Sequence, residues 1–404
     1  QHRIWSLPGS DGMALHSERV LIRTQEKEKV FDLVRKEKIQ LVVIGPEQPL
    51  QEGLSDFLRD HDVLVFGPSR NAAQLETSKI YAKHFMRAAD LPTAMFEIVS
   101  GVQDTLDKAM AFSPPYVFKV DGLAAGKGVY ICENQAQLKA AAKAVFEEKM
   151  FGDSGNQALL ESYQTGYELS YLILTNGIES VSLPVSQDHK RLLNANRGPN
   201  TGGMGAIAPM QIEFELKAQI HEQIVTPLLH ELNQQDLLYR GVLYIGIMVT
   251  ADGPKVLEFN CRFGDPEAQV LLPLLEGDWG EVFMAVARGE IPPVQWKDQA
   301  AAAVVMAAAG YPEKPVAGDM ILGDLTTVTS DSYFIHAGTA LDEAGAWKTA
   351  GGRVLNAVGI GENIATAIKK AYQQAGKVTW KGCQYRQDIG GKAQTTSVDR
   401  HGKY

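Results

Sequence analysis

The chain has 404 residues, 45% of them hydrophobic, and a formal net charge of −9 at pH 7. That length exceeds what a single hydrophobic core organises, so we expect about two to four subdomains. The acidic balance argues against a nucleic-acid-binding surface, because contact with a phosphate backbone requires a cationic face. It still allows local phosphate binding through glycine backbone and a few lysines.

The three cysteines, Cys132, Cys261 and Cys383, are widely spaced and odd in number. Such spacing forms neither a disulfide framework nor a CxxC metal site, and it favours a reducing compartment. The longest apolar run, 300–309, is about half of a membrane span and indicates a buried strand. No secretory signal is visible at the first residues. We therefore expect a cytoplasmic protein without membrane contact.

The first 78 residues alternate short apolar runs with helical patterns, which predicts a parallel-sheet domain. The predicted elements are a strand over 3–7, a helix over 27–37, strands over 41–44 and 63–66, and a helix over 72–89. The last two strands both end in Gly-Pro, which directs the chain to the carboxyl edge of the sheet. Ligands bind at that edge in open α/β sheets.

From about residue 93 the pattern changes to strands paired around loops. The predicted elements are strands over 116–119 and 129–132, a helix over 135–148, strands over 158–162 and 168–175, a polar stretch over 187–204, a helix over 213–232, and strands over 242–249 and 255–260. Asn134 and Gln137 resemble a capping box for the first of these helices. Beyond residue 300, short strands and turns precede a helix over 364–375, and residues 395–404 form a polar tail.

The strongest local signal is the glycine-rich segment Lys119-Val-Asp-Gly-Leu-Ala-Ala-Gly-Lys-Gly-Val129. Gly122, Gly126 and Gly128 let backbone N–H groups approach phosphate oxygens, and Lys119 and Lys127 add positive charge. The segment is not a Walker A loop, because no Ser or Thr follows the lysine and the chain continues into a strand. It predicts a hairpin over a triphosphate. An ordinary glycine-containing hairpin is the alternative when the segment is taken alone.

A second signal is the run Val256-Leu-Glu-Phe-Asn-Cys-Arg-Phe-Gly-Asp-Pro-Glu267. Side chains alternate along a strand, so Glu258 and Asn260 lie on one face. Two oxygen ligands at that spacing suit Mg²⁺, which takes its other ligands from water and phosphate. Arg262, further along the same face, can neutralise a transferring phosphoryl group. The alternative, a merely solvated polar face, is weakened by the neighbouring phosphate loop.

A third signal is the polar segment 186–191 followed by Arg197-Gly-Pro-Asn-Thr-Gly-Gly-Met-Gly205. Its glycines predict a loop whose backbone contacts a substrate closely, whereas a flexible surface connection would be favoured if the segment stood alone. His189 by itself is weak evidence, and we assign it no metal role.

Together these segments closely resemble the phosphoribosylamine–glycine ligase family. Further matches are Ile44-Gly-Pro-Glu-Gln-Pro-Leu50, Phe66-Gly-Pro68, 73–79 and His336-Ala-Gly-Thr339, so that the similarity runs from the first residues to about 392. The stretches GPNTGGMG and EFNCRFGDPE are far more specific than a lone glycine loop. The resemblance implies an ATP-grasp fold, in which two α+β lobes enclose ATP beside a parallel-sheet domain.

The resemblance also implies roles for individual residues. Lys79 and Lys119 would contact ATP phosphates, residues 161–163, including Glu161 and Tyr163, would meet adenine through their backbone, and Glu168 would hold the ribose hydroxyls. Glu258 and Asn260 would bind Mg²⁺ or Mn²⁺, and Arg262 and Lys119 would assist the chemistry. The substrate pockets for glycine and phosphoribosylamine would be bordered by Asp188, Lys190, Pro199, Asn200, Thr201, Gly202 and Gly203.

The implied activity is ATP-dependent ligation of glycine to 5-phosphoribosylamine through a glycyl phosphate, in purine biosynthesis. The expected division is an α/β parallel-sheet domain over 1–78, an ATP-grasp domain over 79–290 with its smaller lobe at 93–165, and a small mixed α/β domain over 291–394. The family begins with a strand, a glycine-rich turn and a helix, whereas this sequence starts at what corresponds to the second strand. We therefore expect the first domain to lack its first strand, and we expect this chain to bind ATP but to make glycinamide ribonucleotide poorly or not at all.

Two other functions stay open at this point. One is a different ATP-grasp ligase, such as a phosphoribosyl-aminoimidazole carboxylase ATPase subunit or a biotin carboxylase, although GPNTGGMG and HAGT weigh against it. The other is nucleotide binding without turnover. The expected partners are small molecules, with no nucleic acid or membrane, and the expected state is a monomer or weak homodimer.

Overall fold

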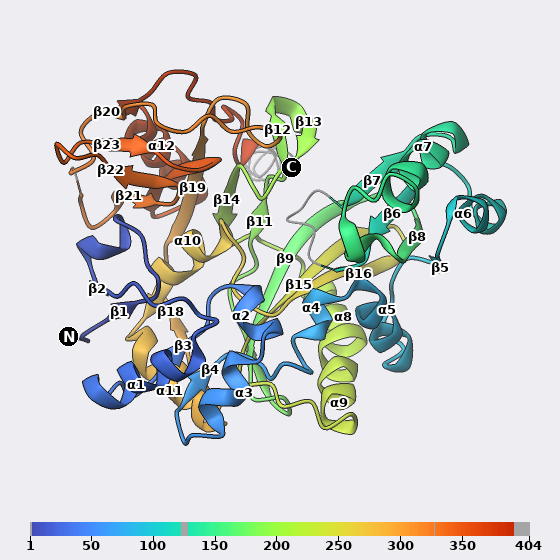
Figure 1. Cartoon of the computed structure of the whole chain (residues 1–404), viewed down its shortest axis with the longest axis horizontal. Helices are drawn as coiled ribbons and strands as arrows, with labels where there is room; N and C mark the ends of the chain where they lie inside the picture. Colours follow the sequence, from blue (N-terminus) through green and yellow to red (C-terminus); the bar gives the residue numbers. More distant parts are fainter. Residues whose placement is uncertain (1, 123–127, 327, 392–404) are drawn as a thin grey trace, which may run out of the picture.

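The computed structural model describes residues 2–122, 128–326 and 328–391, and within them the chain forms N-terminal, central and C-terminal parts. Figure 1 shows these parts from blue through green and yellow to red, with one blue-green lobe, labelled α6 and α7, projecting away from the rest. In the described ranges, no helix combines the length and hydropathy needed to cross a bilayer.

The N-terminal part contains two short pairs of parallel strands, in agreement with the predicted parallel arrangement. β1 (Trp5–Ser6) pairs with β2 (Glu18–Arg19), and β3 (Val42–Val43) pairs with β4 (Val65–Phe66). Its helices are α1 (Lys27–Glu37), α2 (Glu47–Gln51) and α3 (Leu54–Arg59). α1 has the predicted bounds. The sequence pattern does not reveal α2 and α3, because each is too short to show a helical period.

The segment leading out of this part is two helices, α4 (Gln74–Thr77) and α5 (Lys79–Ala88), so the prediction of one helix over 72–89 is wrong. The break lies at Ser78, whose backbone is extended with φ −134° and ψ 114°. Its hydroxyl accepts a hydrogen bond from the Tyr81 N–H and caps α5, which is the usual role of serine at a helix start. The break places Lys79 in the first turn of α5.

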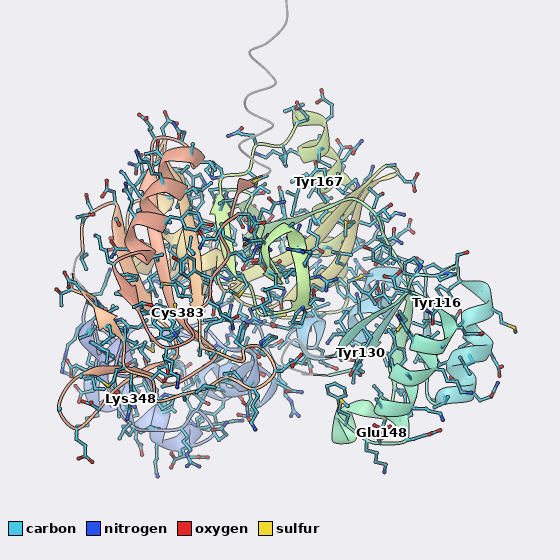
Figure 2. The ribbon with its side chains drawn as sticks, turned by 90° about the horizontal axis from the view of Figure 1, so that it is seen from above. Tyr116, Tyr130, Glu148, Tyr167, Lys348 and Cys383 are labelled. Carbon is cyan, nitrogen blue, oxygen red and sulfur yellow. The ribbon has the colours of Figure 1, made fainter. Side chains whose placement is uncertain are left out.

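The projecting lobe is a four-stranded antiparallel sheet in the order β5-β8-β6-β7, covered by two helices. Its elements are β5 (Phe96–Val99), α6 (Val102–Lys108), β6 (Tyr116–Val120), β7 (Val129–Cys132), α7 (Gln135–Phe146) and β8 (Ala158–Ser162). The Asn134 side chain caps α7 by accepting from the Gln137 N–H, as predicted. Figure 2 shows this lobe apart from the rest, with Tyr116, Tyr130 and Glu148 labelled on it.

The larger lobe is built on the antiparallel sheet β10-β9-β15-β16. Its strands are β9 (Tyr167–Thr175), β10 (Ser180–Ser182), β15 (Gly241–Thr250) and β16 (Gly253–Asn260). The predicted helix over 213–232 is α8 (Phe214–Ile220) and α9 (Thr226–Gln234), joined by a π-helical turn that the apolar period does not reveal. The helices bury Ile220, Leu228 and Leu232 in the same core as strands β9 and β15.

A five-stranded antiparallel sheet, β11-β14-β19-β24-β21, joins the central and C-terminal parts. Its strands are β11 (Gln187–Asp188), β14 (Gly205–Ala208), β19 (Ala300–Ala307), β21 (Ser332–His336) and β24 (Arg353–Gly361). β19 is buried along its whole length, which agrees with the buried strand predicted from the apolar run over 300–309. Helix α12 (Ile364–Ala375), with its predicted bounds, packs on β19 and β24. One strand of this sheet, β11, thus comes from the polar stretch 187–204, and β14 directly follows that stretch.

The remaining elements are short. They are α10 (Glu267–Leu271), α11 (Trp279–Arg288) and the strand pairs β12 (Arg191–Leu193) with β13 (Arg197–Asn200), β17 (Leu275–Glu276) with β18 (Gln295–Trp296), β20 (Leu322–Gly323) with β25 (Val378–Thr379), and β22 (Thr339–Leu341) with β23 (Trp347–Thr349). The hairpin β12–β13 lies within the stretch 187–204, so that stretch is ordered as strands rather than as a single loop.

Candidate active site

The start of the glycine-rich hairpin is fixed to the first turn of α5. The Asp121 carboxylate accepts hydrogen bonds from the Ile80 N–H at 3.1 Å and from the Ser78 hydroxyl at 3.2 Å. Lys79 Nζ donates to the Gly122 carbonyl at 3.1 Å. Gly122 and Gly128 are described, whereas Gly126 and Lys127 lie outside the described residues. Lys79 is therefore close to the segment that the sequence predicts to cover a triphosphate.

Lys119, at the end of β6, faces a buried carboxylate. Lys119 Nζ lies 3.0 Å from Glu161 Oε2, and Lys83 Nζ lies 3.5 Å from the same oxygen. Glu161 is the penultimate residue of β8, and Tyr163 follows the strand with an exposed side chain. The predicted backbone contact of 161–163 with adenine stays a prediction. The sequence reading did not assign Lys83 a role, although its i, i+4 spacing from Lys79 places both on one face of α5.

Glu258 and Asn260 lie on one face of β16, as their spacing predicts. Glu258 pairs in register with Gly246, where a Cβ would come 3.2 Å from the Glu258 side chain. Lys190, opposing burial, lowers the pKa of Glu258 to about 2, and Lys119 and Lys79 act in the same direction. The carboxylate is thus ionised at neutral pH, which fits a ligand of a hard divalent cation.

The donors around β16 are too few to form a closed metal site. Within the described ranges, no group of three or more His, Cys, Asp or Glu side chains is placed to hold a metal. An ion bound by Glu258 and Asn260 would take its other ligands from water and phosphate oxygens, which is the usual arrangement for Mg²⁺ beside ATP.

Lys190 connects the polar stretch to the ATP-grasp sheet. Its ammonium lies 3.3 Å from Glu258 Oε1 and 3.4 Å from Glu168 Oε2. Burial would lower the pKa of Lys190, but Glu258 and Glu168 raise it well above its usual value. The structure thus brings together Glu168 on β9, Glu258 on β16 and Lys190, three residues that the sequence singled out separately.

The glycine loop is folded against Asp188. Thr201 Oγ1 donates to the Lys190 carbonyl at 2.8 Å and accepts from the Gly203 N–H at 3.0 Å. Asp188 Oδ1 is buried and has no hydrogen-bond partner among the described residues. Burial, together with the nearby Glu267, raises the pKa of Asp188 well above its usual value. Pro199 and Asn200 form the end of β13 in the same segment.

Two residues of the C-terminal part hold this loop, and the sequence reading did not find them. Tyr311 accepts a hydrogen bond from the Gly202 N–H at 3.0 Å. Arg353 donates to the Gly202 carbonyl at 2.5 Å and to the Asp265 carbonyl at 2.6 Å, and it pairs with the Asp265 carboxylate at 2.9 Å. The motif Gly351-Gly-Arg353 gives no signal of this contact, because the partners are over 80 residues away in sequence.

Arg262 is held in ion pairs, whereas an arginine that assists phosphoryl transfer would need its guanidinium free to contact the phosphoryl group. Its guanidinium pairs with Glu76 at 2.8 Å and with Glu47 at 3.2 Å. It also lies 3.5 Å from Asn260 Oδ1, at the limit of a hydrogen bond. Arg262 therefore joins the N-terminal part, the α4 segment and the end of β16, and its assistance to phosphoryl transfer stays a prediction.

Comparison with known proteins agrees with this geometry. Models of the N, ATP-grasp and C domains of phosphoribosylglycinamide synthetase match residues 1–76, 77–268 and 301–392. A phosphoribosylamine–glycine ligase of Nostoc is 40% identical over 391 residues, covering 95% of this chain and 92% of that protein. The crystal structure of the corresponding ligase of Thermotoga maritima superposes with a TM-score of 0.84 at 35% identity, over 96% of this chain and 94% of the other.

The biotin carboxylase domain of Hydrogenobacter thermophilus 2-oxoglutarate carboxylase also superposes, with a TM-score of 0.71 over 91% of this chain and 82% of the other. At 15% identity this likeness shows the fold alone. The three domain matches and the 40% identical relative place the chain in one family: it belongs to the phosphoribosylglycinamide synthetases, the phosphoribosylamine–glycine ligases, with an ATP-grasp fold.

Proposed function

We propose that the protein ligates glycine to 5-phosphoribosylamine at the expense of ATP, as its family does. A carboxylate oxygen of glycine attacks the γ-phosphorus of ATP, and ADP leaves. The amine nitrogen of phosphoribosylamine then attacks the carbonyl carbon of glycyl phosphate, phosphate leaves, and one proton is released from the nitrogen. The product is glycinamide ribonucleotide, an intermediate of purine biosynthesis.

One observation carries this proposal: Lys190, from the polar stretch, reaches Glu258 and Glu168 on the ATP-grasp sheet. The segment that resembles a substrate loop is thereby held beside the residues proposed to hold ATP and its metal. Phosphoryl transfer depends mainly on positioning and on neutralising charge, which lysines and a divalent cation supply. We infer that the segment binds glycine and phosphoribosylamine.

Individual residues would act as follows. Lys79 and Lys119 would bind ATP phosphates beneath the glycine-rich hairpin that includes Gly122 and Gly128, with residues 161–163 meeting adenine and Glu168 the ribose. Glu258 and Asn260 would hold Mg²⁺ or Mn²⁺, which neutralises phosphate charge when bound. Asp188, with an oxygen free of partners in the described part of the chain, would accept a hydrogen bond from a substrate amino group.

The test is ADP release with glycine and phosphoribosylamine each omitted in turn. We expect release only when both are present. Glycine labelled with ¹⁸O in its carboxylate should deliver one label to the phosphate produced, since the acyl phosphate oxygen leaves with phosphorus. ADP release that needs neither substrate, or that depends on bicarbonate instead, would contradict the proposal and favour a different ATP-grasp enzyme.

A further inference from the structure

The charged side chains of Lys83, Lys119 and Glu161 form a cluster next to the proposed phosphate site. Glu161 and Lys83 have side chains that are each only 2% exposed, and Lys119 is 12% exposed. Both ammonium groups contact the same carboxylate oxygen, Glu161 Oε2, whereas Oε1 is buried without a partner among the described residues. Of the three, Lys119 is the most accessible and is the residue proposed to contact ATP.

Lys83 also contacts the segment that connects α5 to β5. Its Nζ lies 2.6 Å from Thr93 Oγ1, and the Thr93 hydroxyl donates to the Val256 carbonyl at 2.7 Å. The Val256 N–H in turn donates to the Pro92 carbonyl at 2.7 Å. Val256 is on β16, two residues before Glu258. A continuous chain of contacts therefore runs from the carboxylate beneath Lys119 to the strand that carries the proposed metal ligands.

Lys119 makes a second contact with the same strand. Its Nζ lies 3.5 Å from the Leu257 carbonyl, next to Val256. The cluster thus joins β6 and β8 of the smaller lobe to α5 and β16, which share the core of the larger lobe.

The charge of the cluster depends on Lys83. With both lysines protonated, the cluster carries one net positive charge next to the phosphates. Without Lys83, Glu161 would neutralise Lys119, and the cluster would attract phosphate less. Opposite charges at such distances interact strongly where water is excluded.

We propose that Lys83 is a positioning residue for ATP: it shares the Glu161 carboxylate, so that Lys119 keeps its charge and its direction toward the phosphates, and it ties this arrangement to β16 through Thr93. The inference deepens the proposed function and rests on it, since it assumes that Lys119 binds ATP phosphates.

A purely structural role explains the cluster less well. Burial lowers the pKa of Lys83 to about 8, and the attraction of Glu161 does not fully offset this. Burying an ion pair is often no more stabilising than burying apolar side chains of similar size. A buried lysine at this position is therefore costly for stability alone, and its benefit is expected in nucleotide binding.

Binding experiments with the whole protein test the proposal. Lys83→Met keeps the length of the side chain and removes its charge. We expect the Kd for MgATP and MgADP to rise roughly tenfold or more, in the range of a lost charged hydrogen bond, while the Kd for adenosine stays nearly constant. Lys83→Arg, which restores the charge, should recover part of the loss. Arg87→Met is the matched control, because Arg87 lies one turn further along α5 and stacks on Phe96.

A double-mutant cycle shows whether Lys83 acts through Lys119. If it does, Lys83→Met should weaken MgATP binding much less in a Lys119→Met background than in the wild type, so the two effects are not additive. Additive losses would overturn the proposal, as would unchanged MgATP affinity in a folded Lys83→Met variant, or an equal loss for adenosine.

If the Lys83→Met variant does not fold, the Thr93→Val variant tests the proposal instead. This variant cuts the contact between Lys83 and β16, and we expect about a threefold rise in the Kd for MgATP, as for one neutral hydrogen bond. No change would overturn the proposed tie to β16. Binding is measured without glycine or phosphoribosylamine, so a failure of this inference is distinguishable from a failure of the ligase assay described above.

Discussion

At the scale of single residues, Glu258 on β16 and Glu76 on α4 show that the surroundings of a glutamate decide whether its pKa falls or rises. The pKa of Glu258 falls to about 2 because Lys190, Lys119 and Lys79 surround it. The pKa of Glu76 rises to about 7, because burial outweighs the attraction of Arg262. The first glutamate is thus suited to hold a cation, and the second is a source of pH dependence.

Removing the charge of Glu258 tests the proposed metal site. We expect Glu258→Gln to lower ligase turnover by roughly two or more orders of magnitude, because a neutral amide is a poor Mg²⁺ ligand. The thermal midpoint should fall as well, because Lys190 loses a partner, so turnover is measured at a temperature where the variant is folded. Glu97→Gln, an exposed change on β5, is the control. Near-normal turnover of a folded Glu258→Gln variant would contradict the role of Glu258 as a metal ligand.

Glu76 gives a prediction about pH. Its folded-state pKa, about 7, is above the ordinary value of 4.5, so its contribution to stability is full below pH 4.5 and is lost as the pH rises through 7. Relative to Glu76→Gln, the wild type should lose about 3 kcal/mol of unfolding free energy between pH 4 and pH 8. Thermal melts of both proteins across this range measure the difference, and parallel curves would contradict the assignment.

At the scale of elements, the break at Ser78 decides the geometry of the phosphate site. A continuous helix over 72–89 would use the Ile80 N–H, which now donates to Asp121, for a hydrogen bond within the helix, and would leave Lys79 in the middle of that helix. Because Ser78 caps a new helix, the first turn of α5 holds the start of the glycine-rich hairpin. A helical period in the sequence cannot show such a break, since serine is tolerated within helices and also caps them.

The glycine loop offers a prediction at this scale. Gly203 has φ +112°, a region that side chains avoid, and a Cβ there would overlap Pro266 and lie 2.8 Å from Asp188 Oδ1. Gly203→Ala should strain the loop by about 1–3 kcal/mol, so turnover should fall while MgATP still binds. Gly101→Ala, where a Cβ meets no atom within 4 Å, is the control. Equal turnover of the two variants would show that the loop geometry is not needed.

At the scale of the whole molecule, the proposed substrate segment is shared between domains. β11 and β14 join the sheet of the C-terminal part, and Arg386 of that part donates to the Arg191 carbonyl at 3.1 Å. The Ala195 N–H donates to the Asp388 carboxylate at 2.7 Å. A division of the chain at about residue 290 thus separates segments that act on the same loop, although the domain limits themselves stay a prediction.

Arg353 tests this arrangement. Arg353→Met removes three contacts to Gly202 and Asp265, and we expect the KM for glycine or phosphoribosylamine to rise about tenfold or more. The affinity for MgATP should not change, because Lys79 and Lys119 are untouched. Arg288→Met, an exposed change at the end of α11, is the control. A loss confined to MgATP binding would contradict the role assigned to the C-terminal part.

The sequence by itself determined the family, the parallel strand pairs of the N-terminal part, the hairpin of β6 and β7, the bounds of α1 and α12, and the shared face of Glu258 and Asn260. These features depend on side-chain period and on short motifs, which are local. Only the tertiary structure decided that Glu161 lies between Lys83 and Lys119, that Lys190 meets Glu258, and that Tyr311 and Arg353 hold Gly202. These contacts join residues that are distant in sequence. The strength of the interaction between their charges depends on burial and on distance, and both are set only when the chain folds.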